Sequence, residues 1–348
     1  MLRKAILFSG NLLALIAGFG LLARFVPPDV WWPPSVISLL LPGLLLVTLL
    51  FLLLCLYWKK WRSALLPALI LVATMPLIGR LFAFGQPADS SQESSPISVL
   101  TANVHSFKDQ SWKGMPAETA TRFIKDSPPD ILLLQEARSE RPVSSFIEEV
   151  KAASQLSKRH QPQKKTIAIY ANEITFVKDV FNTPRGYNGY LISDVKTHLG
   201  TIRVINAHLQ SNQISGMAGE IGQDSTLAEG LGRAESMFRS YGASAAIRAQ
   251  QANEIRKAIK ESPYPVIVGG DFNDVPSSYT YQRILTPRLR DAWAEAGFGT
   301  GTTFTGPLPG LRIDFLLVDT SLSVLDIERI ETGYSDHRAL RAKIARRK

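Results

Sequence analysis

Three long apolar stretches in the first quarter of the chain constrain its fold more than any other feature. They cover about Ala5–Phe25, Ser35–Tyr57 and Ala64–Phe84. Each is close to the roughly 20 residues that a helix needs to cross the hydrocarbon core of a bilayer. A cleaved signal peptide is the alternative for the first stretch, but this stretch has no clean small-residue cleavage site and two more apolar stretches follow it. The sequence therefore predicts three transmembrane helices and a multi-pass protein of the cell membrane.

The charges beside these stretches predict their orientation. Arg3 and Lys4 precede the first stretch, and the second connecting loop, "WKKWR" (58–62), is basic. The first connecting loop, "VPPDVWWPP" (26–34), has neither Lys nor Arg. Because positively charged loops stay in the cytoplasm, the N-terminus and the second loop are expected inside. Three spans then place everything after residue 85 outside the cytoplasm.

The positive charge of the whole chain is concentrated in the same region. The net charge is +9, from 39 basic and 30 acidic residues. Residues 1–85 contain seven basic residues and one acidic residue, which leaves 32 basic and 29 acidic residues for the remainder. The high isoelectric point is therefore a poor indication of nucleic-acid binding. Cys55 is the only cysteine, which excludes a disulfide framework and a thiolate metal site.

The chain is predicted to have three parts. Residues 1–84 form the membrane anchor, the polar segment "GQPADSSQESSP" (85–96) reads as a linker, and residues 97–348 form one large domain. Helices are expected at 117–127 and 242–262, while the Gly-rich segment 215–241 is ambiguous. Gly200 is expected in a hairpin turn. Mixed strands and helices favour α/β packing. The predicted strands cover 97–104, 130–136, 166–171, 173–180, 189–198, 201–209, 265–270, 313–319 and 338–344.

Polar side chains recur at the ends of these apolar strands. A single polar residue there has a simple explanation, since it leaves the core and meets water. Several that match in chemistry indicate a site. They are Asn103, Glu136, His208, Asp271, Asn273, Asp314, Asp336 and His337.

This set suits phosphoester hydrolysis. Carboxylates offer the hard oxygen ligands that Mg²⁺ or Mn²⁺ prefers. Asp271 is able to accept a proton or orient water, and Asn103 and Asn273 are able to donate to phosphate oxygens. The two histidines supply protonated donors, and an aspartate beside a histidine holds its tautomer and raises its pKa.

The order of the motifs resembles the endonuclease/exonuclease/phosphatase family over about 97–348. The motifs are "TANV", "LLLQE", "NAHLQ", "GGDFND", "RIDFLLV" and "SDHRAL". The resemblance implies a four-layer α/β sandwich, like that of deoxyribonuclease I, with metal-dependent phosphoester cleavage at one edge of two packed sheets. It implies that Glu136 is the main metal ligand and that Asp336 and Asn103 are further residues of the metal site. It also implies catalytic roles for five residues, namely His208, Asp271, Asn273, Asp314 and His337.

The sequence leaves more than one role open for some further residues. His105 stands where some branches of the family carry an acidic metal-site residue, so it is expected either beside the substrate or metal, or in a structural role. Asn103 is also a candidate for substrate binding. Tyr279 follows "GDFNDVP" at the predicted start of a helix capped by Ser277 or Ser278, and is expected to contact substrate.

The sequence thus predicts a membrane-anchored phosphoesterase with a Mg²⁺ or Mn²⁺ cofactor. Its substrate class stays open between nucleic acid, phospholipid head groups and small phosphate esters. The expected partners are this substrate and the lipid bilayer, and no obligate protein partner is evident. The alternative is a non-catalytic, membrane-tethered binding module that has kept the fold.

Overall fold

The computed structural model describes residues 1–85, 95–138, 143–181, 186–212, 227–306 and 310–347. These residues form two compact units. The first unit contains Met1–Leu81, Asn212–Ala252 and Asp274–Arg283, and the second contains Phe82–Ser211, Asn253–Asn273 and Ile284–Lys348.

The first unit contains the apolar helices. They are α1 (Leu2–Leu22), α2 (Pro33–Leu39), α3 (Leu41–Tyr57) and α4 (Trp61–Leu81). By length and composition α1 and α4 are each able to cross a membrane, whereas α2 and α3 pass this test only as a pair bent by 74°. The described residues thus contain two candidate spans, or three if the bent pair counts as one. The bend falls at Leu40, just before Pro42, where the missing N–H of proline favours a helix start.

Apolar side chains lie both inside and outside this helical unit. Leu41 and Leu77 belong to its core, whereas Phe8, Leu50 and Met75 are more than half exposed. A helix that is apolar all round is typical of a lipid environment.

Two further helices contribute to the first unit. Helix α8 (Leu227–Lys260) begins there, and its Tyr241 and Ala245 pack against Val36 and Leu39 of α2. Helix α9 (Tyr279–Ile284) follows the "GDFND" segment, and its N-terminus is capped as expected by Ser278, whose Oγ accepts from the Tyr281 N–H at 3.1 Å. Helix α8 starts well before the predicted 242, so 227–241 is helical, and 215–226 lies outside the described residues.

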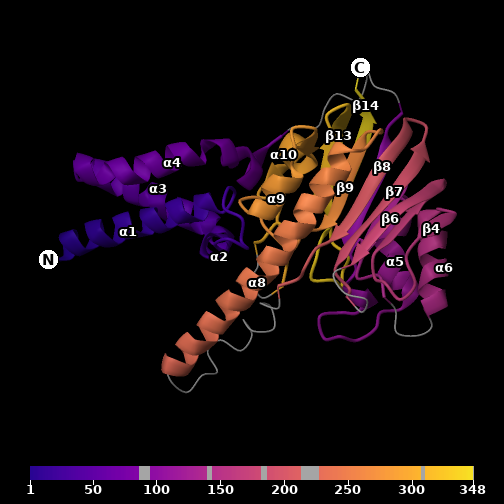
Figure 1. Cartoon of the computed structure of the whole chain (residues 1–348), viewed down its shortest axis with the longest axis horizontal. Coiled ribbons are helices and arrows are strands. Elements are labelled where there is room, and N and C mark those ends of the chain that lie inside the picture. Colours follow the sequence, from indigo (N-terminus) through magenta and orange to yellow (C-terminus); the bar gives the residue numbers. More distant parts are fainter. Residues whose placement is uncertain (86–94, 139–142, 182–185, 213–226, 307–309, 348) are drawn as a thin grey trace. The chain divides into compact units, whose positions relative to one another are not determined.

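The second unit is built on two six-stranded sheets (Figure 1). One has the strand order β10-β12-β9-β8-β7-β6, and the other β13-β14-β2-β3-β5-β4. The first sheet comprises β6 (Ile174–Phe181), β7 (Gly189–Thr197), β8 (Gly200–His208), β9 (Val266–Asp271), β10 (Leu289–Asp291) and β12 (Asp314–Asp319). The second comprises β2 (Ile97–Asn103), β3 (Ile131–Gln135), β4 (Lys158–His160), β5 (Ala168–Ala171), β13 (Leu322–Ile330) and β14 (Ala339–Arg346). Gly200, with φ +104°, makes the predicted turn between β7 and β8.

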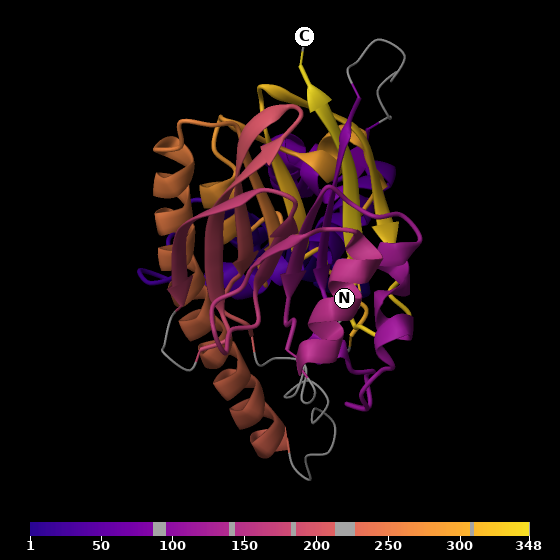
Figure 2. The same ribbon diagram turned by 90° about the vertical axis from the view of Figure 1, so that its right-hand side faces the viewer.

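Helices cover the outer faces of the sheets. Helices α5 (Ala117–Lys125) and α6 (Val143–Ser154) lie outside the sheet that contains β2, as Figures 1 and 2 show in magenta. Along β2 the side chains alternate: Val99 faces the core between the sheets, and Leu100 packs with Phe123 of α5. Because both faces are buried, apolar residues occur on both sides of the strand and do not alternate with exposed polar ones. The four-layer α/β sandwich is confirmed.

A small two-stranded sheet corrects the end of the third predicted span. Helix α4 ends at Leu81, not Phe84, and Ala83–Phe84 form β1, which pairs with β11 (Phe298–Gly299). Ala83 is buried with Trp293 of α10 (Ala292–Ala296) in the core of the second unit. The apolar run does not stop at Leu81, so only the distant partner strand reveals the change from helix to strand.

Candidate active site

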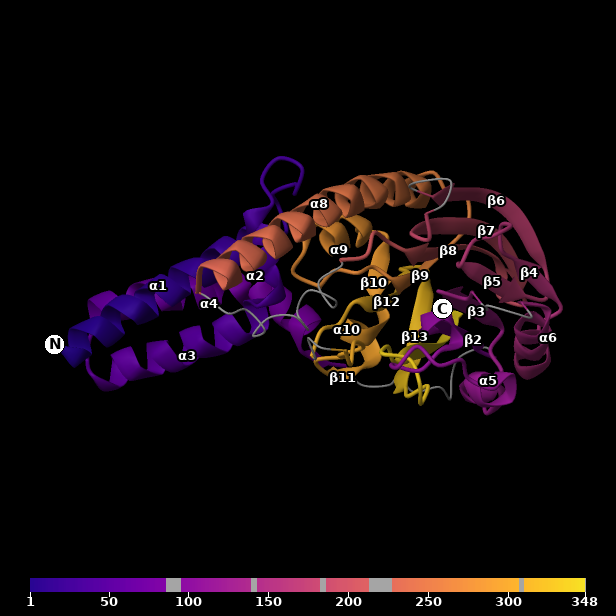
Figure 3. The same cartoon turned by 90° about the horizontal axis from the view of Figure 1, so that it is seen from below.

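The strand order brings the predicted site residues to one edge of the second unit. Strands β2 and β3 run parallel, so Asn103 at the end of β2 lies level with Gln135, the residue before Glu136. Strands β8 and β9 are also parallel and pair His208 with Asp271, while antiparallel β12 pairs Asp314 with Asp271. Strands β2 and β3 of one sheet lie beside β8 and β9 of the other (Figure 3).

Asn103 connects the two sheets at the centre of this edge. Its Nδ2 lies 3.2 Å from Glu136 Oε1 and 3.1 Å from Asp271 Oδ2. His208 Nε2 lies 3.7 Å from each of the same two carboxylate oxygens. Two carboxylates, an amide and an imidazole therefore face one small volume.

A second hydrogen-bonded group adjoins Asp271. His337 Nδ1 lies 2.9 Å from Asp314 Oδ2, and His337 Nε2 lies 3.9 Å from Asp271 Oδ2. Asp314 thereby fixes the orientation of the imidazole ring, with Nε2 turned toward Asp271. The ring of Phe304 packs edge-on against His337, at 5.2 Å between ring centroids.

Burial and charge shift the pKa values of this group. Burial raises the pKa of Asp271 to about 6, although the attraction of His337 opposes the change. Burial acts to lower the pKa of His337, but Asp314 and Asp271 outweigh it and raise this pKa to about 10. At neutral pH an imidazolium therefore stands beside the Asp271 carboxylate.

Asn273 and Asp336 lie on the loops that border this group. The Asn273 N–H donates to Asp271 Oδ1 at 2.8 Å, and its Nδ2 to Leu209 O at 3.1 Å. The Asp336 carboxylate is half-buried, and its charge contributes to the raised pKa of His337. The structure thus brings Asn273 to Asp271 and Asp336 to His337.

His105 is tied to the loop that follows β2. Its N–H donates to Asn103 Oδ1 at 3.1 Å, and its Nδ1 lies 3.1 Å from Lys108 O. The His105 ring packs on Trp112, with 4.7 Å between ring centroids, and Trp112 is 63% exposed. His105 is thus held beside Asn103 together with an exposed indole ring.

Tyr279, at the start of α9, belongs to the first unit. Its predicted contact with substrate therefore stays a prediction.

Several residues that support the site are missing from the set that the sequence predicted. Ser335 Oγ donates to Asn103 O at 2.8 Å and accepts from the His337 N–H at 3.0 Å. Beneath the site, Gln135 Nε2 donates to Asn206 Oδ1 at 2.7 Å, across the interface between the two sheets. Both amides are fully buried. Their positions inside the motifs "LLLQE" and "NAHLQ" were available as a signal, but a lone buried amide has no spacing that distinguishes it.

The donor atoms fit a hard divalent cation. The side chain of Glu136 is 30% exposed and offers carboxylate oxygen to the solvent side. Asp271, Asp314 and His337 also form a buried group whose ligand atoms lie within 4.8 Å of one another, close enough to bind an ion. In that group, however, His337 Nδ1 is already engaged by Asp314.

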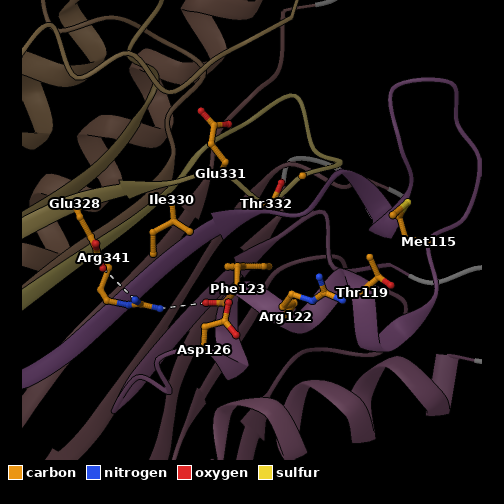
Figure 4. A pocket seen from close by; sticks show the side chains of 11 residues that line it. Met115, Thr119, Arg122, Phe123, Asp126, Glu328, Ile330, Glu331, Thr332 and Arg341 are labelled. Atoms are coloured by element: carbon orange, nitrogen blue, oxygen red, sulfur yellow. Dashed lines mark hydrogen bonds and ion pairs between the residues drawn. The ribbon is translucent and has the colours of Figure 1, made fainter.

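A pocket of about 430 Å³ lies elsewhere in the second unit (Figure 4). It opens between α5 and the strands β13 and β14, and contains none of the predicted site residues. Its buried Arg341 is held by Glu328 and by the carbonyl oxygens of Phe123 and Ser127.

Comparison with solved structures supports this fold. An endonuclease/exonuclease/phosphatase structure from Beutenbergia cavernae is 16% identical, with a TM-score of 0.51, and the match covers 73% of this chain and 72% of that one. A humanized D. rerio TDP2 is 17% identical, with a TM-score of 0.51, over 72% of this chain and 99% of that one. D. rerio TDP2 complexed with a single-strand DNA product is 16% identical, with a TM-score of 0.50, over 72% of this chain and 99% of that one.

The family models divide the chain in two. Residues 3–81 match a domain of unknown function (DUF8431). A search of curated proteins finds no match. Residues 100–337 match the model of the endonuclease/exonuclease/phosphatase family, and the strand ends that carry Asn103, Glu136, His208, Asp271 and His337 all lie within this range. The chain therefore belongs to the endonuclease/exonuclease/phosphatase family.

Proposed function

We propose that this protein is a membrane-anchored phosphoesterase that depends on Mg²⁺ or Mn²⁺, with its catalytic domain outside the cytoplasm. One observation carries the proposal: the amide of Asn103 donates to the carboxylates of both Glu136 and Asp271, and His208 faces the same two carboxylates. A phosphoester carries negative charge, so it would be repelled by this group unless a cation is bound there.

Glu136 is the residue best placed to hold that ion. Its carboxylate is partly open to solvent, whereas the group of Asp271, Asp314 and His337 is buried and internally hydrogen-bonded. Asp336 is a further candidate ligand. The amide oxygen of Asn103 accepts from His105 and its Nδ2 faces the carboxylates, which supports a donor role for Asn103 more than a role as ligand. When bound, the ion supplies charge neutralisation for the phosphate and polarises its ester oxygen.

The remaining groups fit the roles of an ester hydrolysis. The Asp271 carboxylate accepts a proton from the attacking water, because its raised pKa of about 6 makes it a better base than an ordinary aspartate. Its position is fixed by Asn273 N and by Asn103. His337, whose ring is held by Asp314, donates a hydrogen bond from Nε2 to a phosphate oxygen as negative charge develops there. His208 donates a second hydrogen bond from the other side of the phosphate.

The candidate substrates belong to three classes. The structural neighbour with a single-strand DNA product supports nucleic acid as one candidate. Tethering to a bilayer favours phospholipid head groups, because it raises their effective concentration. A small phosphate ester is the third candidate.

The test is hydrolysis by the full chain in lipid vesicles. We would supply Mg²⁺ or Mn²⁺ with plasmid DNA, single-strand DNA, sphingomyelin or phosphatidylinositol phosphates, and measure phosphate-ester products. We expect turnover of one class, its loss on addition of a chelator, and its loss in Glu136→Ala and His337→Ala. Turnover that is unchanged in both variants would contradict the assigned site. A folded wild type that turns over none of these substrates would favour the non-catalytic binding module.

A further inference from the structure

Three phenylalanines form an exposed patch on the small sheet of the second unit. Phe84 of β1 lies opposite Phe298 of β11 in the pairing, and Phe82 precedes β1. The Phe82 ring lies 4.9 Å from that of Phe84 and 5.8 Å from that of Phe298, measured between centroids. The exposed fractions are 38% for Phe82, 66% for Phe84 and 71% for Phe298. A cluster of exposed aromatic rings on a domain surface marks an interaction site.

The patch is held firmly on the second unit, which carries the candidate active site and is called the catalytic domain below. Side chains alternate along a strand, so Ala83 points opposite to Phe82 and Phe84, and it is buried among Ala292 and Trp293. The indole N–H of Trp293 donates to Gly299 O at 3.2 Å, which fixes β11 to α10. The phenylalanines are therefore displayed by a structured element.

The covalent chain places this patch at the end of a candidate membrane span. Phe82 is the residue directly after Leu81, the last residue of α4. Consecutive Cα atoms are about 3.8 Å apart, so no linker separates the span from the patch. The headgroup and interfacial regions add roughly 5–8 Å on each side of the hydrocarbon core. Phe82 follows a candidate span directly and must then lie in or next to this layer, and Phe298 pairs with Phe84, which is two residues further along the chain.

We propose that Phe82, Phe84 and Phe298 form a membrane-docking patch that holds the catalytic domain against the lipid headgroup layer. The proposal rests on the membrane anchoring of the proposed function. Aromatic side chains are favoured at this interface, and the rings lose contact with water there. The catalytic domain would thus be fixed to the bilayer surface by a short strand, and the polar segment 86–94 would not set its distance from the lipid.

The test is an environment-sensitive fluorophore at position 298 in the full chain. Cys55 is buried in the helical unit and is replaced in a Cys55→Ala background, so that Phe298→Cys carries the only thiol. The labelled protein is placed in phosphatidylcholine vesicles, with and without phosphatidylcholine spin-labelled near the headgroup. We expect a blue-shifted emission, quenching by the spin-labelled lipid and protection from an aqueous quencher. The matched control is Phe176→Cys, because Phe176 lies on β6 and is 55% exposed. A probe at this position should show the red-shifted emission of a fluorophore in water.

The possible failures are distinguishable. If the chain floats with vesicles while the probe at 298 behaves like the probe at 176, docking is overturned and anchoring stands. A probe shielded from both quenchers would indicate contact with protein, such as a second copy, and would also overturn docking to lipid. If the chain does not float with vesicles, anchoring and docking fail together. The Glu136→Ala substitution is also introduced into the protein labelled at position 298, and its hydrolysis is measured separately. If docking is correct, this variant loses activity but keeps the same probe signal.

Discussion

Three residues at the candidate site adopt a left-handed backbone conformation although none is a glycine. They are His105 (φ +41°), Glu136 (φ +52°) and Asn273 (φ +52°). Such conformations are unfavourable for most side chains, and they concentrate where function fixes the direction of a side chain. Here hydrogen bonds hold them, for example from Ser106 N to Glu136 O at 3.1 Å. The loops that follow the strands therefore fix the directions of the side chains at the site.

The first prediction concerns the charge of Glu136. Glu136→Gln keeps the size of the side chain and removes its negative charge, so Mn²⁺ should bind at least about tenfold more weakly. Isothermal titration with Mn²⁺ measures this affinity, and the phosphoesterase assay should show a parallel loss. The control is Glu148→Gln on α6, where the side chain is 71% exposed. Equal Mn²⁺ affinity in the two variants would contradict the assignment of Glu136 as ligand.

The second prediction concerns the pair of Asp314 and His337. Asp314 contributes to the raised pKa of His337, about 10, so the imidazolium persists across neutral pH. Removing the negative charge in Asp314→Asn lowers this pKa, and the alkaline limb of the rate profile should move to lower pH. Turnover should also fall by about 10²-fold or more, because the ring loses its orientation. The exposed Asp179→Asn on β6 serves as control. A loss of rate with an unmoved alkaline limb would indicate a structural role only.

The sequence was informative about these residues for a physical reason. Glu136, Asp271 and His337 follow or precede apolar strands, where a titratable side chain stands out against its neighbours. Ser335 has no such contrast, and its two hydrogen bonds depend on the three-dimensional approach of the loop to Asn103.

At the scale of elements, a buried amide pair joins the two sheets directly below the site. Asn206 of β8 accepts from Gln135 Nε2 and donates to Leu134 O at 3.0 Å and Ala168 O at 2.8 Å. These contacts cross from one sheet to the other, so they fix how the strand ends that carry the site meet.

The third prediction tests this connection. Asn206→Ala removes three buried hydrogen bonds, those to Leu134 O and Ala168 O and that from Gln135 Nε2, which keeps Thr101 Oγ1 at 3.1 Å, and this should lower the free energy of unfolding by about 3 kcal/mol. Thermal or chemical denaturation measures the loss. Turnover should fall with it, because the two halves of the site are no longer held in register. Asn172→Ala provides the control: Asn172 is exposed and accepts from Ser157 N, so its loss should cost about 1 kcal/mol or less. Equal costs for the two variants would contradict the bridging role.

The elements that the sequence predicted well are those with buried faces. Strand β3, "ILLLQ", is buried throughout and was expected within one residue of its bounds. Strand β13, "LSVLDIERI", was not predicted, because it stands at the edge of its sheet, where β14 is its one neighbour among the described strands, and it carries charged residues. Strand β1 was absorbed into the third predicted span, since its pairing with Gly299 is invisible to any local pattern.

At the scale of the whole molecule, the charges and the apolar helices favour one orientation of the chain in a membrane. Five of the seven basic residues of the first quarter lie at the N-terminus and in 58–62, while Arg24 and Arg80 lie near the opposite ends of their apolar stretches and the loop 26–34 has none. The rest of the chain is nearly balanced, so a strong electrostatic attraction to nucleic acid is not built into the catalytic domain as a whole. The sequence predicted this division from composition, whereas the bend between α2 and α3 needed the structure.

The fourth prediction is the topology of the full chain in cells. Crossing the membrane is costly for the basic loop 58–62, so this loop should stay in the cytoplasm and the segment after α4 should lie outside. In a Cys55→Ala background, a thiol introduced by Ser91→Cys should react with a membrane-impermeant maleimide in intact cells. A thiol introduced by Lys60→Cys should react only after the cells are permeabilised. The reverse pattern would place the catalytic domain in the cytoplasm, and labelling of both thiols in intact cells would mean that the helical unit does not separate them. With the expected pattern, Glu136 and its neighbours meet substrates on the outer side of the membrane, where the phospholipid head groups of the outer leaflet and nucleic acid from outside the cell are both within reach.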